Sequence, residues 1–138
     1  MKRAISILLV AIIMLSTVSP VYAVSPAECE SSIQPRWTYL NTVSAYLNIN
    51  VLGIATCEGS AIANVVQDVE VIVRLQQLTD TGWSTIKSWS ATNAGASSAE
   101  GKYAVYKGYT YRTTVAAYVY DDNGNIIETG SASDTFVY

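Results

Sequence analysis

Apolar side chains recur at every second position in two separate stretches, and this alternation limits the fold more than any other feature. In the first stretch these positions are Val69, Val71, Val73 and Leu75. In the second, the residues that share one face are Tyr111, Thr113, Val115, Ala117 and Val119. Because successive side chains of a β-strand point to opposite faces, a period of two predicts strands with one buried face.

Weaker alternation and turn residues predict the remaining strands. We expect them at 45–51, 54–62, 83–91, 103–106 and 126–138. Gly53 ends the first of these, and Gly59 predicts a bulge or bend within the second. The small, polar stretch 92–100 is expected to form a loop.

Turn chemistry separates several of the expected strands. Residues 79–82 contain Asp and Gly, and residues 121–125 contain Asn-Gly, the strongest short hairpin signal. No helix is expected after residue 23. The sequence therefore predicts an all-β fold, an antiparallel two-sheet sandwich of about seven strands, with a barrel as the alternative.

The first 23 residues are typical of a secretory signal peptide. Lys2 and Arg3 precede an apolar run over 4–15, and Val21-Tyr22-Ala23 provides a cleavage site. The run is shorter than the roughly 20 residues that a membrane helix needs, so no stable membrane insertion is expected after cleavage. We predict a secreted, extracellular protein with a signal peptide at 1–23, an N-terminal arm at 24–36 and a sandwich domain at 37–138.

Cys29 and Cys57 are the two cysteines of the chain. An even count in an oxidising compartment predicts a disulfide bond between them, which would tie the arm to the sandwich. Their spacing lacks the C-x-x-C pattern of a redox pair.

Basic residues are few and scattered along the predicted mature chain. They are Arg36, Arg74, Lys87, Lys102, Lys107 and Arg112, against 11 acidic residues. Because binding to phosphates requires clustered Lys and Arg, no nucleic acid partner is expected.

Two segments carry a resemblance to known proteins. Residues 71–89, VIVRLQQLTDTGWSTIKSW, followed by GYTYRTTV at 108–115, resemble a family of small secreted proteins of Gram-positive bacteria. The second segment is also similar to the sixth strand of immunoglobulin-like and fibronectin type III domains. The resemblance covers about 45–138 and implies that fold, but no activity and no functional residue.

The resemblance also implies a structural role for Tyr111. In immunoglobulin-like domains a tyrosine near the start of this strand bonds back to the preceding corner, and Tyr111 is the matching residue. Antibody-type domains have a cysteine two residues later, where Thr113 stands here. The resemblance therefore implies that Cys29 and Cys57 form a different bridge.

The absence of histidine excludes many catalytic templates, including the Ser-His-Asp triad and the Cys-His pair. No phosphate-binding glycine loop occurs. The remaining acid–base groups are carboxylates, among them Glu28, Glu30, Glu58, Asp68, Glu70, Asp80, Glu100, Glu128 and Asp134. We expect these to be solvated surface groups and predict no enzyme, no cofactor and no metal site.

The turn at 121–125 has one further interpretation. Asp121, Asn123 and Asn125 alternate as calcium ligands do, but the glycine falls at Gly124 instead of after the third ligand, and Ala132 stands where the closing Glu would be. A hairpin turn is the main interpretation, and weak calcium binding is the alternative.

Aromatic residues provide the best argument for binding. A recognition face is predicted from Arg112, Tyr118, Tyr120, Trp83 and Trp89. The alternative is that these side chains only pack across strands or cover the sandwich.

We therefore predict a secreted, monomeric, non-catalytic interaction module that binds a protein or a surface glycan. A carbohydrate-binding module is the alternative, and would need a coplanar row of exposed aromatics. A toxin or bacteriocin is disfavoured because the chain lacks a basic amphipathic segment. A small enzyme would need two acids that converge in a pocket.

Overall fold

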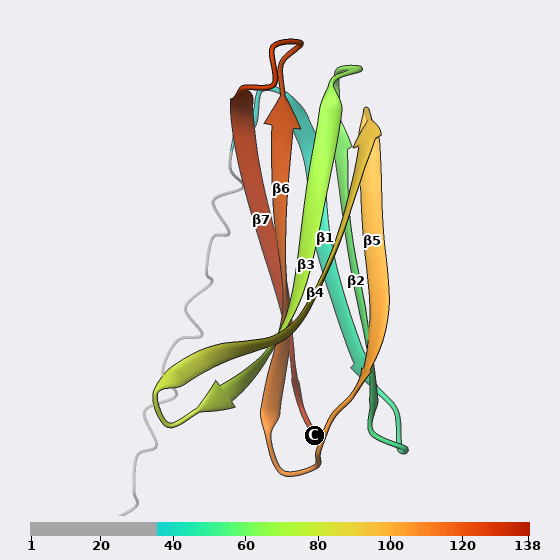
Figure 1. The fold of residues 1–138 in the computed structure, drawn as a ribbon, viewed down its shortest axis with the longest axis vertical. Helices are drawn as coiled ribbons and strands as arrows, with labels where there is room; N and C mark the ends of the chain where they lie inside the picture. Colours follow the sequence, from blue (N-terminus) through green and yellow to red (C-terminus); the bar gives the residue numbers. More distant parts are fainter. Residues whose placement is uncertain (1–35) are drawn as a thin grey trace, which may run out of the picture. The chain divides into compact units, whose positions relative to one another are not determined.

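The computed structural model describes residues 36–138, which form two antiparallel β-sheets (Figure 1). The strands are β1 (Leu40–Ile49), β2 (Ile54–Ala63), β3 (Asp68–Thr79), β4 (Gly82–Ala94), β5 (Ala96–Ala104), β6 (Thr110–Tyr120) and β7 (Ile126–Val137). One sheet has the order β1-β2-β5 and the other β4-β3-β6-β7. This confirms the predicted immunoglobulin-like, fibronectin type III-like sandwich of seven strands. The predicted signal peptide and residues 24–35 of the arm lie outside the described residues.

The core lies between the two sheets and follows the predicted alternation. The inner side chains of β3, from Val69 to Leu75, are fully buried. Those of β6, from Tyr111 to Val119, are at most 1% exposed. Leu47 and Ile49 of β1 complete this core from the opposite sheet, whereas Val51 lies in the following turn and is exposed.

Gly59 of β2 lies in close contact with the opposite sheet. The pairing of β2 with β1 and with β5 runs through Gly59 without a register shift, so the predicted bulge is wrong. A Cβ atom at this position would lie 2.6 Å from methyl groups of both Val73 and Val115. The glycine is therefore required by packing against the opposite sheet, not by a change in backbone direction.

The predicted loop over 92–100 is instead the end of β4 and most of β5. The chain crosses from one sheet to the other at Gly95, whose φ of 74° is in the left-handed region that favours glycine. Nine residue pairs with β2 hold β5 in place. The alternation was hidden because the buried positions are the small Ser97 and Ala99. The predicted strand 103–106 is correct only for residues 103–104, which form the end of β5, whereas residues 105–106 lie outside any strand.

Two carboxylates of β7 bind backbone groups of β1, the edge strand of the other sheet, and of the two residues before it. Glu128 accepts hydrogen bonds from the N–H groups of residues 38–40 at 2.5–2.8 Å. Asp134 accepts one from the N–H of Leu47 at 2.8 Å. These bonds satisfy donors that an open edge would leave to water or to another chain. Both acids therefore have a structural role at the seam between β1 and β7.

We expect Gly59→Ala to lower the free energy of unfolding by about 1–3 kcal/mol, because the added methyl overpacks the core against Val73 and Val115. Urea denaturation followed by tryptophan fluorescence measures this change. Glu58→Ala, at the adjacent solvent-exposed position, is the matched control and should change stability far less. Equal stability of Gly59→Ala and the native chain would contradict this packing.

The titration of Glu128 should make the stability of the fold depend on pH. Burial acts to raise the pKa of Glu128, but the backbone donors of Leu40, Thr38 and Tyr39 outweigh it and hold the pKa below its ordinary value of 4.5. Its stabilising effect is therefore present above pH 4.5 and is lost as the pH falls through the lower folded value.

We predict that Glu128→Gln flattens the fall in Tm between neutral pH and about pH 3, because Gln lacks the titrating carboxylate. Thermal unfolding followed by circular dichroism at a series of pH values checks this. Glu100→Gln, on the exposed face of β5, is the control and should keep the native slope. If the dependence of Tm on pH is unchanged in Glu128→Gln, the contact of Glu128 with residues 38–40 is not the cause of the loss of stability in acid.

Candidate functional site

Four of the five residues of the predicted recognition face lie on the outer face of the four-stranded sheet. Arg112, Tyr118 and Tyr120 alternate with the buried residues of β6, and all three are half-buried. Trp83 of β4 joins them, because the Arg112 guanidinium lies over its ring, 4.2 Å from the ring centroid.

Trp89 does not lie on this face, so its predicted place in the recognition face is wrong. It pairs in register with Val73, whose side chain faces the core, and it packs partly buried against that core. Its indole covers Gly101 of β5, where a Cβ atom would come within 2.0 Å of the ring. Trp89 therefore closes the gap between β4 and β5 and is not part of the outer face.

Two members of the outer face are held by specific partners. The Nε group of Arg112 donates to the amide oxygen of Gln76 at 2.7 Å, which fixes the guanidinium beside Trp83. Tyr120 donates its hydroxyl to Glu70 at 2.5 Å. This hydrogen bond to the Glu70 carboxylate is the main cause that raises the pKa of Tyr120. Tyr120 is thus engaged within the sheet, whereas Tyr118 borders open space.

Two adjoining hollows lie on this face. One, of about 400 Å³, is lined by Tyr118, Trp37 and Thr129, among others. The other, of about 420 Å³, is lined by Arg74 and Arg112. Ala116 and Ser131 line both, so the hollows adjoin. We call this surface the outer groove; its lining side chains are Trp37, Arg74, Arg112, Thr114, Ala116, Tyr118, Ser131 and Ser133.

Arg74 and Trp37 belong to the groove but were not among the predicted site residues. Arg74 lies between the inward-facing Val73 and Leu75, so the period of two already places it on the outer face. Arg74 lies next to Arg112 because of the pairing of β3 with β6, and the sequence does not reveal this pairing. Trp37 precedes β1 and packs partly buried against the core beside Gly130 of β7, so only its edge lines the end of the groove.

Tyr111 makes the hydrogen bond that a tyrosine corner requires. Its hydroxyl donates to the carbonyl of Tyr106 at 2.8 Å and accepts the N–H of the same residue at 3.1 Å. Burial, only partly offset by this bond, raises the pKa of Tyr111. The ring is buried, so the bond anchors the connection between β5 and β6 to the core.

Cys57 lies on the inner face of β2, fully buried. Burial raises the pKa of its thiol, and the neighbouring Thr113 hydroxyl offsets part of this effect. That hydroxyl lacks the geometry of a hydrogen bond to any described residue. Cys29 lies outside the described residues, so the predicted bridge stays a prediction. If it forms, it brings the Cys29 sulfur into the interior beside Thr113.

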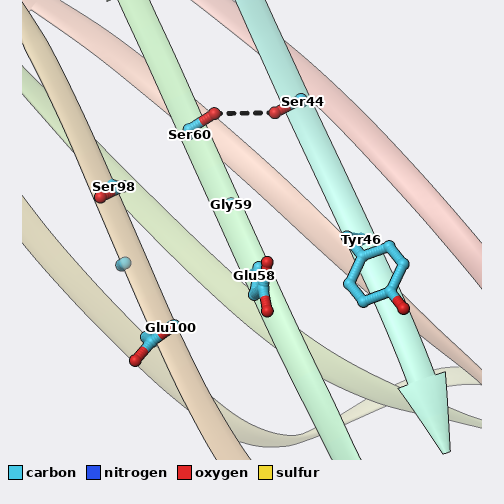
Figure 2. A pocket seen from close by; sticks show the side chains of 8 residues that line it. Ser44, Tyr46, Glu58, Gly59, Ser60, Ser98 and Glu100 are labelled. Atoms are coloured by element: carbon cyan, nitrogen blue, oxygen red, sulfur yellow. Dashed lines mark hydrogen bonds between the residues drawn. The ribbon is translucent and has the colours of Figure 1, made fainter.

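The outer face of the three-stranded sheet carries a separate, acidic hollow of about 230 Å³ (Figure 2). Glu58 and Glu100 are directly opposite each other on β2 and β5, with Tyr46 beside them on β1. In the next row the hydroxyls of Ser44 and Ser60 are 2.7 Å apart. Both carboxylates are exposed to solvent, and no group of three or more metal-binding side chains occurs within residues 36–138.

The turn at 121–125 is a hairpin turn between β6 and β7. Asp121 accepts hydrogen bonds from the backbone N–H groups of Asn123 and Asn125 at 2.9 and 2.8 Å. The side-chain amide of Asn125 donates to the same carboxylate. These bonds lower the pKa of Asp121, the one from the Asn125 side chain most. The carboxylate thus organises the turn, with Gly124 at a φ of 80°.

One end of the sandwich exposes apolar side chains. Val51 and Leu52 in the β1–β2 turn are 94% and 82% exposed, and Tyr106 in the β5–β6 connection is 80% exposed. The two segments are joined by a hydrogen bond from the N–H of Val105 to the carbonyl of Gly53, at 2.8 Å. We call this second surface the apolar end.

Comparison with known proteins adds no assignment. No protein-family model matches the sequence, and no curated protein is significantly similar to it. Within the described part of the chain, no helix is long and apolar enough to cross a membrane.

We predict that Thr113→Cys, in a Cys29→Ser background, forms a disulfide with Cys57, because the two side chains meet between the sheets. A loop of this length should add about 4 kcal/mol to the free energy of unfolding on the chain-entropy model, less any strain. Urea denaturation with and without reductant measures the gain.

Mass spectrometry after alkylation in denaturant, without reductant, counts the free thiols. The Thr113→Cys variant should take up no label, and two labels would contradict the proximity. The native chain serves as a comparison, since it takes up no label if Cys29 and Cys57 are bridged as the sequence predicts.

Proposed function

We propose that this chain is a secreted, non-catalytic interaction module that binds a protein or a glycan at a cell surface through the outer groove. The observation that carries this proposal is that the two hollows adjoin, which brings two arginines and two aromatic side chains to one surface. Aromatic and arginine side chains contribute most to binding at recognition surfaces. A signal peptide at 1–23 supports export of the module.

A carbohydrate-binding role is the second candidate. Trp37 and Tyr118 line the same hollow together with the hydroxyl of Ser131. Sugars bind to such sites through stacking on flat aromatic faces and through hydrogen bonds to hydroxyl groups. The arrangement of Trp37 and Tyr118 supports this candidate more than the predicted pair of Trp83 and Trp89, which lie on different faces.

A non-catalytic role fits the surroundings of the carboxylates. Glu58 and Glu100 are directly opposite each other on β2 and β5, and both are exposed to solvent. A general acid needs an environment that raises its pKa, such as an apolar pocket. Glu128 and Asp134 are occupied by backbone donors of β1.

We expect Tyr118→Ala to weaken binding at least tenfold, since truncation of an aromatic hot spot costs about 2 kcal/mol or more and tenfold corresponds to about 1.4 kcal/mol. The test is a binding screen of the purified secreted chain against intact bacterial and host cells and against immobilised polysaccharides. Tyr103→Ala is the matched control, because Tyr103 is 40% exposed on β5 and lies outside the outer groove.

A Val51→Ser/Leu52→Ser variant tests the apolar end in the same screen. Binding that is lost in this variant and retained in Tyr118→Ala would move the recognition surface to the apolar end and contradict the proposal. Absence of saturable binding to every cell type and polysaccharide would contradict the proposed function itself.

A further inference from the structure

We propose that Arg74 and Arg112 form an anion-binding subsite in the outer groove and that its ligand is an acidic polysaccharide, one whose sugars carry carboxylate or sulfate groups. The inference rests on the proposed function and names the class of ligand. It begins from the placement of the two arginines on adjacent strands.

Arg74 of β3 and Arg112 of β6 lie in neighbouring rows on the same face of the sheet. In the pairing of these strands Arg74 is opposite Thr114, and Gln76 is opposite Arg112. The arginines are thus diagonal neighbours, close enough for long side chains to approach each other. Both line the same hollow of about 420 Å³.

No carboxylate neutralises this pair within the rows that flank it. Arg74 has Ser88 on its other side, and Arg112 has Thr135. The residues that line the hollow include no Asp or Glu. Two like charges on adjacent strands repel each other, and a bound anion relieves this repulsion. The two arginines therefore favour binding of an anion, although the rest of the domain is acidic.

Arg112 is also held in place before any ligand arrives. Its Nε group donates to Gln76 at 2.7 Å, and its guanidinium stacks on Trp83. The two Nη groups remain for a ligand, and they match the two oxygens of a carboxylate or sulfate. A side chain that is already fixed loses less conformational entropy when it binds.

The rest of the groove suits a sugar polymer. Beside the arginines lie the hydroxyl side chains of Thr114, Ser131 and Ser133, which can pair with sugar hydroxyls. Farther along the same face is Tyr118, on which a neighbouring sugar ring can stack, and Trp37 lines the same hollow. A nucleic acid would need a longer series of cations along its backbone, and only two line this groove.

The experiment measures binding of the full secreted chain to dextran sulfate, to polygalacturonate and to uncharged dextran. Dextran and its sulfate share a backbone, so their difference isolates the anionic group. The test variant is Arg74→Gln/Arg112→Gln. The control is Lys102→Gln/Lys107→Gln, which removes the same charge from two exposed residues outside the groove. Urea denaturation confirms that each variant remains folded.

We expect the native chain to bind at least one of the two acidic polymers at least tenfold more tightly than dextran, with an affinity that falls as salt is added. The arginine variant should lose at least tenfold in this affinity, and the lysine variant should keep it. Arg74→Lys/Arg112→Lys should recover only part, because lysine keeps the charge but not the paired donors.

Three results would overturn the inference. Equal losses in the arginine and lysine variants would show an effect of net charge alone. Binding to dextran as tight as to its sulfate would leave the proposed function standing without an anion subsite. Tighter binding to single-stranded poly(dT) than to either acidic polysaccharide, lost in the arginine variant, would assign the pair to a nucleic acid.

Discussion

The close contact of the two sheets over Gly59 is the constraint on which the rest of the sandwich depends. Methyl groups of Val73 and Val115 occupy the space that a side chain at position 59 would need. The inner faces of β3 and β6 can therefore be large, because β2 opposite them presents small residues, Ala55 and Ala61 among them. Packing of large against small residues lets the sheets interdigitate without voids. Cys57 fits the same rule as a small, buried side chain of β2.

The open sides of the sandwich are closed by different chemistry. Between β4 and β5 the indole of Trp89 lies over Gly101, so an aromatic ring covers the seam. Between β1 and β7 the carboxylates of Glu128 and Asp134 bind backbone N–H groups. Residues that look suited to function in the sequence, a tryptophan and two acids, are thereby used for structure. Sheet edges need such cover because unpaired backbone groups can pair with another chain.

The sequence predicted most of the inner face because that face depends on local alternation. The outer face of β6 followed from the same period, so Arg112, Tyr118 and Tyr120 were placed correctly. The period of two did not predict a strand at 92–100, because the buried residues there, Ser97 and Ala99, are too small or polar to give a clear alternation of apolar side chains. It failed again for Trp89, because the register shift at Leu75/Gln76 opposite β4 is set by pairing between strands. The proximity of Arg74 to Arg112 also depends on the pairing of β3 with β6, which no single stretch of sequence encodes.

The distribution of charge between the two outer faces separates what they can attract. The three-stranded sheet presents Glu58 and Glu100, whereas the groove of the four-stranded sheet presents two arginines. The chain carries a formal net charge of −3, which repels polyanions at long range. Because salt screens charges that are more than about 8 Å apart at physiological ionic strength, acids far from the groove have little effect on a ligand bound there, whereas the arginines act at contact. The negative net charge disfavours binding to a nucleic acid. It is nevertheless compatible with a local anion site.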